Sequence, residues 1–175
     1  EDEGHVLVDH RELHRLTELV GKAIEKGLGD SDEIDGAGPC RDMGGETEHT
    51  LYGCRVFLAA GAVDIAQPDI GSVGGFTACK HVIALAQAHG VQVNPHVWGS
   101  AIAQAASLQL AAAVPIAHHS VFAEEPIFEY DRSSHPFRQQ LVAEPAVQRD
   151  GWIDVPTRAG LGVEVVRSVL ERYRV

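Results

Sequence analysis

Apolar residues recur every three or four positions in several stretches of the chain, which is the spacing of one face of an amphipathic helix. Ala78, Val82, Ile83 and Ala86 form such a face, and Gly90 follows them as a helix stop. The same argument predicts helices over 10–25, 50–60, 76–89 and 99–114, and a shorter one over 165–173.

Short, unbroken apolar runs lie between these helices and have the character of buried parallel strands. The runs 62–66 and 91–93 end at Gln67-Pro68-Asp69 and Asn94-Pro95-His96, and a further strand is expected over 126–129. Residues 71–75 are rich in glycine. They predict a tight turn rather than a phosphate-binding loop, because neither a directly following lysine nor a GxGxxG pattern is present.

Strands and helices thus alternate at intervals of roughly 30 residues, the rhythm of parallel βαβ units, which predicts an α/β fold. The regular part spans 44–131, whereas 1–43 holds one helix and lacks a recognisable strand before Gly44. Residues 132–175 break the rhythm. We expect them to form an extension of the same domain, packed outside a barrel or against another domain.

Composition and charge exclude several classes of protein. The formal net charge of −11 disfavours nucleic acid and anionic membranes as partners. No apolar run approaches the ~20 residues of a membrane helix, and the acidic start lacks the features of a signal peptide. Three cysteines without CxxC spacing argue against a disulfide framework and favour a cytoplasmic location.

Four ionisable residues lie where predicted strands end: Glu46, Asp69, His96 and Glu129. They follow one another at intervals of 23, 27 and 33 residues, about one βα unit each. The carboxyl ends of parallel barrel strands meet on one face, where active sites are built. We therefore expect the four side chains to share one pocket.

Each of these residues also has a purely structural explanation. Asp69 could cap a following helix. His96 could be a half-buried histidine with satisfied hydrogen bonds, and Glu46 could be a solvated residue of a turn. Glu129 has other acids close by in the sequence. Together, the residue types fit one chemistry: a hard oxygen ligand for Mg²⁺ at Glu46 and a histidine acid/base at His96. Asp69 would orient the imidazole, and Glu129 would face a developing oxyanion.

From Gly44 onwards the sequence resembles the mandelate racemase/muconate lactonizing enzyme family of the enolase superfamily. The likeness lies in motifs that occur in family order, namely Gly44-Gly45-Glu46, Gln67-Pro68-Asp69, Asn94-Pro95-His96, Trp98-Gly99-Ser100, Phe128-Glu129-Tyr130-Asp131 and Gly160-Leu161-Gly162-Val163-Glu164. It implies the C-terminal half of a (β/α)₇β TIM-like barrel without the N-terminal capping domain.

The resemblance also implies roles for single residues. Glu46 would be the last of three carboxylates that hold Mg²⁺, and Asp69 and His96 would form a dyad that moves a proton at the carbon next to a carboxylate. Glu129 would bind the substrate carboxylate with His96 and stabilise the enediolate. Pro95-His96 followed by Trp98-Gly99-Ser100 is more similar to the family's acid-sugar dehydratases than to its racemases. The implied activity is a Mg²⁺-dependent lyase or isomerase acting on a small acid sugar.

Some groups that the resemblance implies are not evident in the sequence. Two further metal carboxylates and a lysine-bearing strand should precede Glu46, and 1–43 offers no clear substitute. A whole barrel usually needs about 250 residues. We therefore expect weak or no activity from the chain alone. The alternative is a non-catalytic remnant, or a subunit that a partner chain or a swapped homo-oligomer completes. A metal-free aldolase is disfavoured, because Lys80 lies inside a predicted helix.

Overall fold

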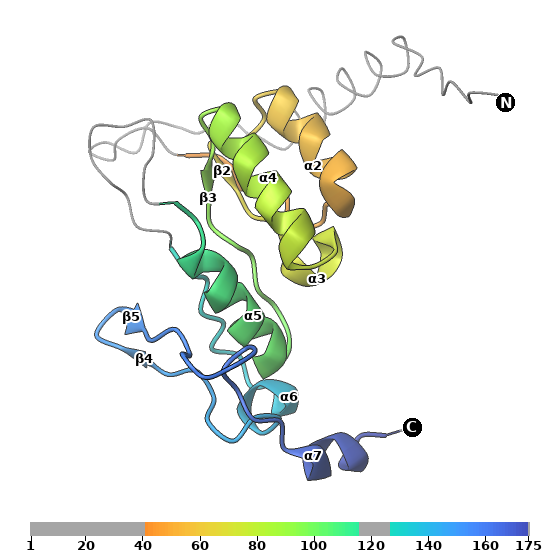
Figure 1. Ribbon diagram of the computed structural model, residues 1–175, viewed down its shortest axis with the longest axis vertical. Helices are drawn as coiled ribbons and strands as arrows, with labels where there is room; N and C mark the ends of the chain where they lie inside the picture. The colour runs from red at the N-terminus through yellow and green to blue at the C-terminus, as the bar shows by residue number, and fades with distance from the viewer. Residues whose placement is uncertain (1–40, 116–126, 175) are drawn as a thin grey trace, which may run out of the picture.

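The computed structural model describes residues 41–115 and 127–174 (Figure 1). Within them three short strands form a parallel sheet in the order β1 (Met43–Gly44), β2 (Ile65–Ala66) and β3 (Gln92–Val93). Gly44 pairs with Ala66, which in turn pairs with Val93. The α/β class predicted from the sequence is therefore confirmed. The predicted helix 10–25 lies outside the described residues.

Two helices cover one face of this sheet and bury the core between them and the strands (Figure 1). They are α2 (Thr50–Ala59) and α4 (Phe76–Ala88), each in the connection between two neighbouring strands. Strand residues Ala66 and Val93 point into this core, whose helix residues include Cys54, Phe57, Leu58, Cys79, Val82, Ile83 and Ala86. Burying these side chains is the main force that holds the βα units together.

The opposite face of the sheet carries polar side chains. Residues alternate between the two faces of a strand, so Gln92 and Asn94 point away from the helices that Val93 contacts. Both are buried, as is Gln67 at the end of β2. The Arg41 guanidinium donates a hydrogen bond from Nη1 to Oε1 of Gln92, with the two atoms 2.6 Å apart. A polar layer therefore lies beneath the carboxyl ends of the strands.

The glycine-rich turn predicted over 71–75 is in part a helix, which corrects the sequence prediction. Helix α3 spans Ile70–Val73, and Asp69 caps its N-terminus. Gly74 and Gly75, with φ of 112° and 90°, then form the tight turn into α4. The helix was missed because a single turn of four residues gives no apolar repeat to recognise.

Helix α5 (Ala101–Ala112) joins the sheet to the C-terminal part of the chain. That part contains α6 (Pro136–Gln139), the antiparallel hairpin of β4 (Gln148–Arg149) and β5 (Trp152–Ile153), and α7 (Arg167–Arg172). Helix α6 packs on α5, and Nε2 of Gln109 donates to the carbonyl oxygen of Pro156 at 2.6 Å. Figure 1 shows these elements in the lower half of the molecule, with the sheet in the upper half.

The strand predicted over 126–129 is wrong in its described part. Residues 127–129 belong to no strand, and the backbone N–H of Ile127 is bonded to a side chain rather than to the backbone of a neighbouring strand. The Ile127 N–H donates to the Asn94 side-chain oxygen, with the two atoms 3.1 Å apart. The strands predicted over 62–66 and 91–93 are present but reduced to two residues each. The strand not recognised before Gly44 is β1.

Helix boundaries predicted over 50–60, 76–89 and 99–114 agree with α2, α4 and α5 to within two residues at each end. The C-terminal helix predicted over 165–173 is α7, two residues shorter at its start. In the described ranges, no helix has both the length and the apolar character needed to cross a membrane.

Candidate active site

Asp69 and His96 face each other at the carboxyl ends of β2 and β3. The sheet register brings them together, since one parallel bridge pairs Asp69 with His96 three residues beyond the paired Ala66 and Val93. Nδ1 of the imidazole lies 3.3 Å from Oδ2 of the carboxylate. Both side chains are partly buried, with exposed fractions of 25% for His96 and 20% for Asp69. Pairing with a carboxylate fixes which ring nitrogen carries the proton.

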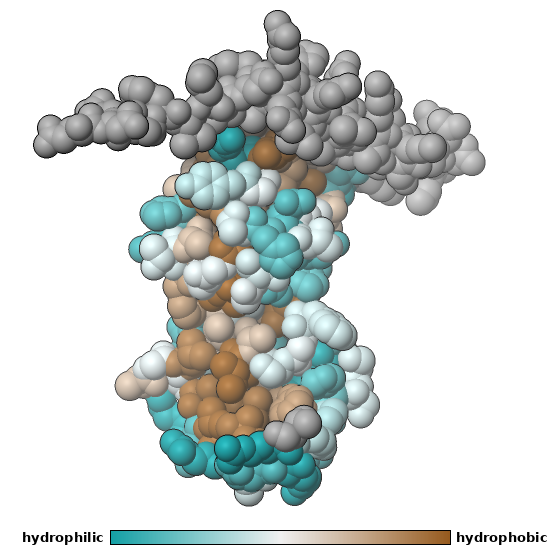
Figure 2. Space-filling model, turned by 90° about the vertical axis from the view of Figure 1, so that its right-hand side faces the viewer, coloured by the Kyte–Doolittle hydropathy of each residue, from teal (hydrophilic) through white to brown (hydrophobic). Residues whose placement is uncertain are grey.

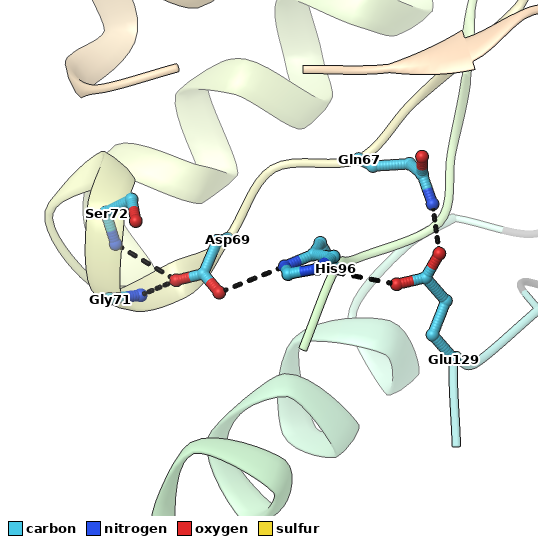
Figure 3. A network of polar contacts seen from close by, with 6 residues as sticks. All are labelled: Gln67, Asp69, Gly71, Ser72, His96 and Glu129. Atoms are coloured by element: carbon cyan, nitrogen blue, oxygen red, sulfur yellow. Dashed lines mark hydrogen bonds and ion pairs between the residues drawn. The ribbon is translucent and has the colours of Figure 1, made fainter. Parts of the chain in front are cut away.

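Asp69 also caps a helix with its second carboxylate oxygen. Oδ1 accepts the backbone N–H of Gly71 at 2.7 Å and that of Ser72 at 3.0 Å. Asp69 therefore acts both as a helix cap, through Oδ1, and as the partner of the imidazole, through Oδ2. These two hydrogen bonds also hold Oδ2 in place toward the imidazole (Figure 3).

Glu129 approaches the imidazole from the other side. Its Oε2 lies 3.9 Å from Nε2 of His96, while Oε1 accepts a hydrogen bond from Nε2 of Gln67 at 2.5 Å. Figure 3 shows the resulting line of contacts, which runs from the start of α3 through Asp69, His96 and Glu129 to Gln67. His96 thus stands between two carboxylates. Nδ1 is held by one of them, and Nε2 faces the other.

This arrangement suits transfer of a proton through Nε2. An imidazole whose Nδ1–H is directed at a carboxylate presents Nε2 as a base, and the same carboxylate stabilises the imidazolium that forms. Three of the four residues singled out from the sequence therefore lie together. A cavity of about 570 Å³ lies elsewhere, between α5 and residues 142–163, and includes none of them.

The comparison with protein families identifies the family to which this α/β chain belongs. A family described as enolase C-terminal domain-like matches residues 29–169. The chain belongs to this family. It is therefore an α/β chain of the C-terminal TIM-barrel domain of the enolase superfamily, as the sequence motifs predicted.

Relatives of known activity act on sugar acids and their lactones. The chain is 44% identical over 136 residues to the D-galactarolactone cycloisomerase of Agrobacterium fabrum, covering 78% of this chain and 36% of that protein. It is 35% identical over 122 residues to the L-rhamnonate dehydratase of Saccharopolyspora erythraea, covering 69% and 29%. The crystal structure of the 3,6-anhydro-D-galactonate cycloisomerase from Zobellia galactanivorans aligns with a TM-score of 0.65 and 36% identity, covering 75% and 35%.

The chain therefore spans about a third of the length of the relatives it matches. The family match also extends across residues 29–43, a stretch that the sequence motifs did not connect to it. The predicted division into 1–43, 44–131 and 132–175 is not tested by these matches and stays a prediction.

Glu46 has no direct contact of the hydrogen-bond or ion-pair kind with the three-residue network of Asp69, His96 and Glu129 in the described part of the chain. It sits in an exposed turn directly after β1. Members of the enolase superfamily generally use Mg²⁺. In the described ranges, however, no three acidic, histidine or cysteine side chains gather as a metal site. Glu46 alone does not fit the near-octahedral oxygen set that Mg²⁺ requires.

Two functional candidates were not predicted from the sequence, because their side chains are not ionisable. Gln67 and Asn94 begin the two strand-end motifs that finish with Asp69 and His96, and both contact the segment that carries Glu129. The signal was present in the repeated pattern of an amide residue, a proline and an acid or base.

The described thiols take no part in the site. Burial raises the pKa of Cys54 to about 11 and that of Cys79 to about 12, so both stay protonated near neutral pH. Neither forms a disulfide. Both side chains are buried, and Cys40 lies outside the described residues.

An ion pair anchors the chain just beyond Glu129. Asp131 pairs with the buried Arg138 guanidinium, which also donates to the carbonyl oxygen of Gly99 at 3.1 Å. Hydrogen bonds from Ser133, and then the charge of Arg138, hold the pKa of Asp131 below its usual value. Asp131 therefore serves to fix the loop rather than to exchange protons.

Proposed function

We propose that this protein abstracts the proton on the carbon next to the carboxylate of an acid sugar and then eliminates the neighbouring hydroxyl as water. Nε2 of His96 takes the proton, with Asp69 holding the imidazole at Nδ1. Glu129 faces the oxygen on which negative charge develops. The observation that supports this best is the imidazole held between two carboxylates, 3.3 Å from one and 3.9 Å from the other.

The reaction balances within the substrate. Breaking the C–H bond leaves an electron pair that forms the carbon–carbon double bond as the neighbouring C–O bond breaks. The proton held on His96 then converts the departing hydroxide into water. A single histidine suffices for both transfers where the hydrogen and the hydroxyl leave on the same side of the sugar chain.

Cycloisomerisation is the second candidate, and the 44% and 36% identities to two cycloisomerases favour it. The first step is the same, but the group expelled from the neighbouring carbon is then part of a ring and stays attached. The product is an isomer of the substrate. Product mass separates the two reactions, because only dehydration loses a water molecule.

We propose further that Glu46 supplies one Mg²⁺ ligand, and that the remaining ligands come from outside the described residues. When bound, the ion would stabilise negative charge on the substrate carboxylate. Those ligands belong to a partner chain, to a second copy or to other parts of the protein. The alternative is that the chain is a non-catalytic remnant. In either case we expect a cytoplasmic location.

The test is hydrogen exchange at the carbon next to the carboxylate. The complete protein is incubated in D₂O with a panel of acid sugars and sugar lactones, with Mg²⁺ and with a chelator, and deuterium incorporation is followed by NMR. We expect Mg²⁺-dependent exchange that falls at least about 100-fold in His96→Ala, the usual scale of general acid/base catalysis.

His81→Ala is the matched control, since His81 is exposed on α4 and lies outside the network. It should leave exchange unchanged. Exchange that survives His96→Ala, or its absence across the panel from a folded protein that binds Mg²⁺, would overturn the proposal.

A further inference from the structure

Two buried amide side chains lie directly beneath the acid/base pair. Gln67 and Asn94 each precede a proline and stand two residues before Asp69 and His96, so the sheet register places them at one level. Gln67 is 7% exposed and Asn94 is 1% exposed. A buried amide is costly unless it makes hydrogen bonds. The contacts of these two residues are therefore informative.

Both amides contact the segment that carries Glu129. Oδ1 of Asn94 accepts the N–H of Ile127, two residues before Glu129, and Nε2 of Gln67 donates to the Glu129 carboxylate itself. No strand pairing holds this segment, because residues 127–129 belong to no strand. Side-chain hydrogen bonds from the neighbouring strand ends take the place of strand pairing.

We propose that Gln67 is a positioning residue for Glu129. By binding Oε1, Gln67 leaves Oε2 as the carboxylate oxygen that faces His96 and the substrate. The inference rests on the proposed function and concerns the same site. Gln67 touches no reacting atom in this scheme and acts through Glu129 alone. Asn94 supports it by fixing the backbone from which Glu129 extends.

The exposure of Glu129 explains why such a contact is needed. Its side chain is 38% exposed, more than that of His96 or Asp69. A carboxylate with this access to water turns freely unless something holds it, because loss of side-chain freedom opposes any single orientation. Gln67 occupies Oε1, which leaves Oε2 directed at the imidazole.

The placement of Gln67 suits this role. It is buried at the end of β2, immediately before a fully buried proline. The proline ring fixes its own backbone φ and restricts the residue before it to extended conformations. Gln67 therefore presents its amide from a rigid position, and an N–H donor directed at a carboxylate is among the stronger hydrogen bonds.

The first experiment replaces Gln67 by leucine, which keeps the approximate shape and removes the donor. In the complete protein we expect the exchange rate to fall roughly 10- to 100-fold, the scale of one lost hydrogen bond to a charged group. Gln109→Leu is the matched control. It removes a glutamine Nε2 donor with a 2.6 Å hydrogen bond on α5, away from this network.

A double-mutant cycle separates positioning from a general structural effect. If Gln67 acts through Glu129, then Gln67→Leu should change the rate by less than about twofold in a Glu129→Ala background. An effect of equal size in both backgrounds would overturn the inference, since Gln67 would then act without Glu129.

A second measurement does not depend on activity. In NMR spectra of the chain, the Gln67 side-chain amide proton that bonds Glu129 should shift upfield in Glu129→Ala, whereas the Gln109 amide signals stay in place. Unchanged Gln67 signals would contradict the contact.

Failure of this inference is distinguishable from failure of the proposed function. Loss of exchange in His96→Ala with full activity in Gln67→Leu would reject only the role of Gln67. Exchange that survives His96→Ala would reject the proposed function, whatever the effect of Gln67→Leu.

Discussion

At the scale of single residues, Asp69 combines two tasks that are usually assigned to different side chains. Oδ1 accepts two backbone N–H groups at the start of α3, and Oδ2 faces the His96 imidazole. The cap requires only an acceptor oxygen, whereas orientation of the imidazole requires a carboxylate. The two tasks are therefore separable by mutation.

Asp69→Asn should preserve stability and lower activity. The asparagine oxygen still accepts the N–H groups of Gly71 and Ser72, but its amide N–H₂ then faces Nδ1. The imidazole must accept there, so Nε2 becomes protonated and is lost as a base. We expect at least a 100-fold lower exchange rate, the usual scale for general-base catalysis, with the midpoint of urea unfolding nearly unchanged.

Asp69→Ala is the comparison, since it removes the cap as well. Losing an N-cap costs about 0.5–2 kcal/mol, which the same urea unfolding experiment measures. Equal stability of the asparagine and alanine variants would show that the cap contributes nothing, and would contradict this division of tasks.

At the scale of elements, the turn between β1 and α2 depends on close packing against a helix. Gly45 has φ of 101°, and a Cβ built on it would lie 2.6 Å from Cζ of Phe57. Phe57 belongs to the core of α2 and is 8% exposed, so its ring has little room to move. The turn that carries Glu46 therefore requires glycine at position 45.

Gly45→Ala should lower the free energy of unfolding by roughly 2–4 kcal/mol, from an unfavourable φ and overpacking of the core together. Gly61→Ala is the control. Gly61 has a φ of 61° but no atom within 4 Å of a built Cβ, so only the backbone cost of about 1 kcal/mol applies. Chemical denaturation measures both, and equal losses would show that contact with Phe57 does not matter.

At the scale of the whole molecule, the described chain is a three-stranded parallel sheet with helices on one face and a C-terminal part packed around α5 (Figure 1). Figure 2 shows hydrophobic residues gathered on the lower half of one side of the molecule. The C-terminal part exposes Trp152, Leu170 and Tyr173 by more than 40% each. Among the described strands, β1 and β3 form the edges of the sheet.

The core links the stability of the whole molecule to alkaline pH. Cys54 on α2 and Cys79 on α4 pack in the same core, and burial raises their pKa values from 9.0 to about 11 and about 12. Well below pH 9 both thiols are protonated in the folded and in the unfolded chain. Above pH 9 the unfolded chain loses protons that the folded chain keeps, so unfolding becomes more favourable as pH rises toward 11–12.

We therefore expect the free energy of unfolding to decline between pH 9 and 11, and to decline less steeply in a Cys54→Ala, Cys79→Ala variant. Urea unfolding at several pH values measures both slopes. Since tyrosines and lysines titrate in the same range, the difference between the two proteins is the decisive quantity. Parallel slopes would indicate that the thiols are not protected by folding.

The sequence by itself determined the α/β class, the helices α2, α4 and α5, and the three residues Asp69, His96 and Glu129 that lie together. Helices and buried strands leave periodic apolar patterns, and parallel strands place their carboxyl ends on one face. Motif order then indicated the family. None of these inferences requires knowing which side chains touch.

Only the tertiary structure decided how Glu129 is held. Its segment looked like a further strand, but Asn94 and Gln67 hold it by side-chain hydrogen bonds, and no local pattern encodes a contact between residues 62 positions apart. The same holds for β1, whose two residues pair with β2 without an apolar run. Contacts between residues far apart in the sequence, rather than sequence periodicity, specify both of these features.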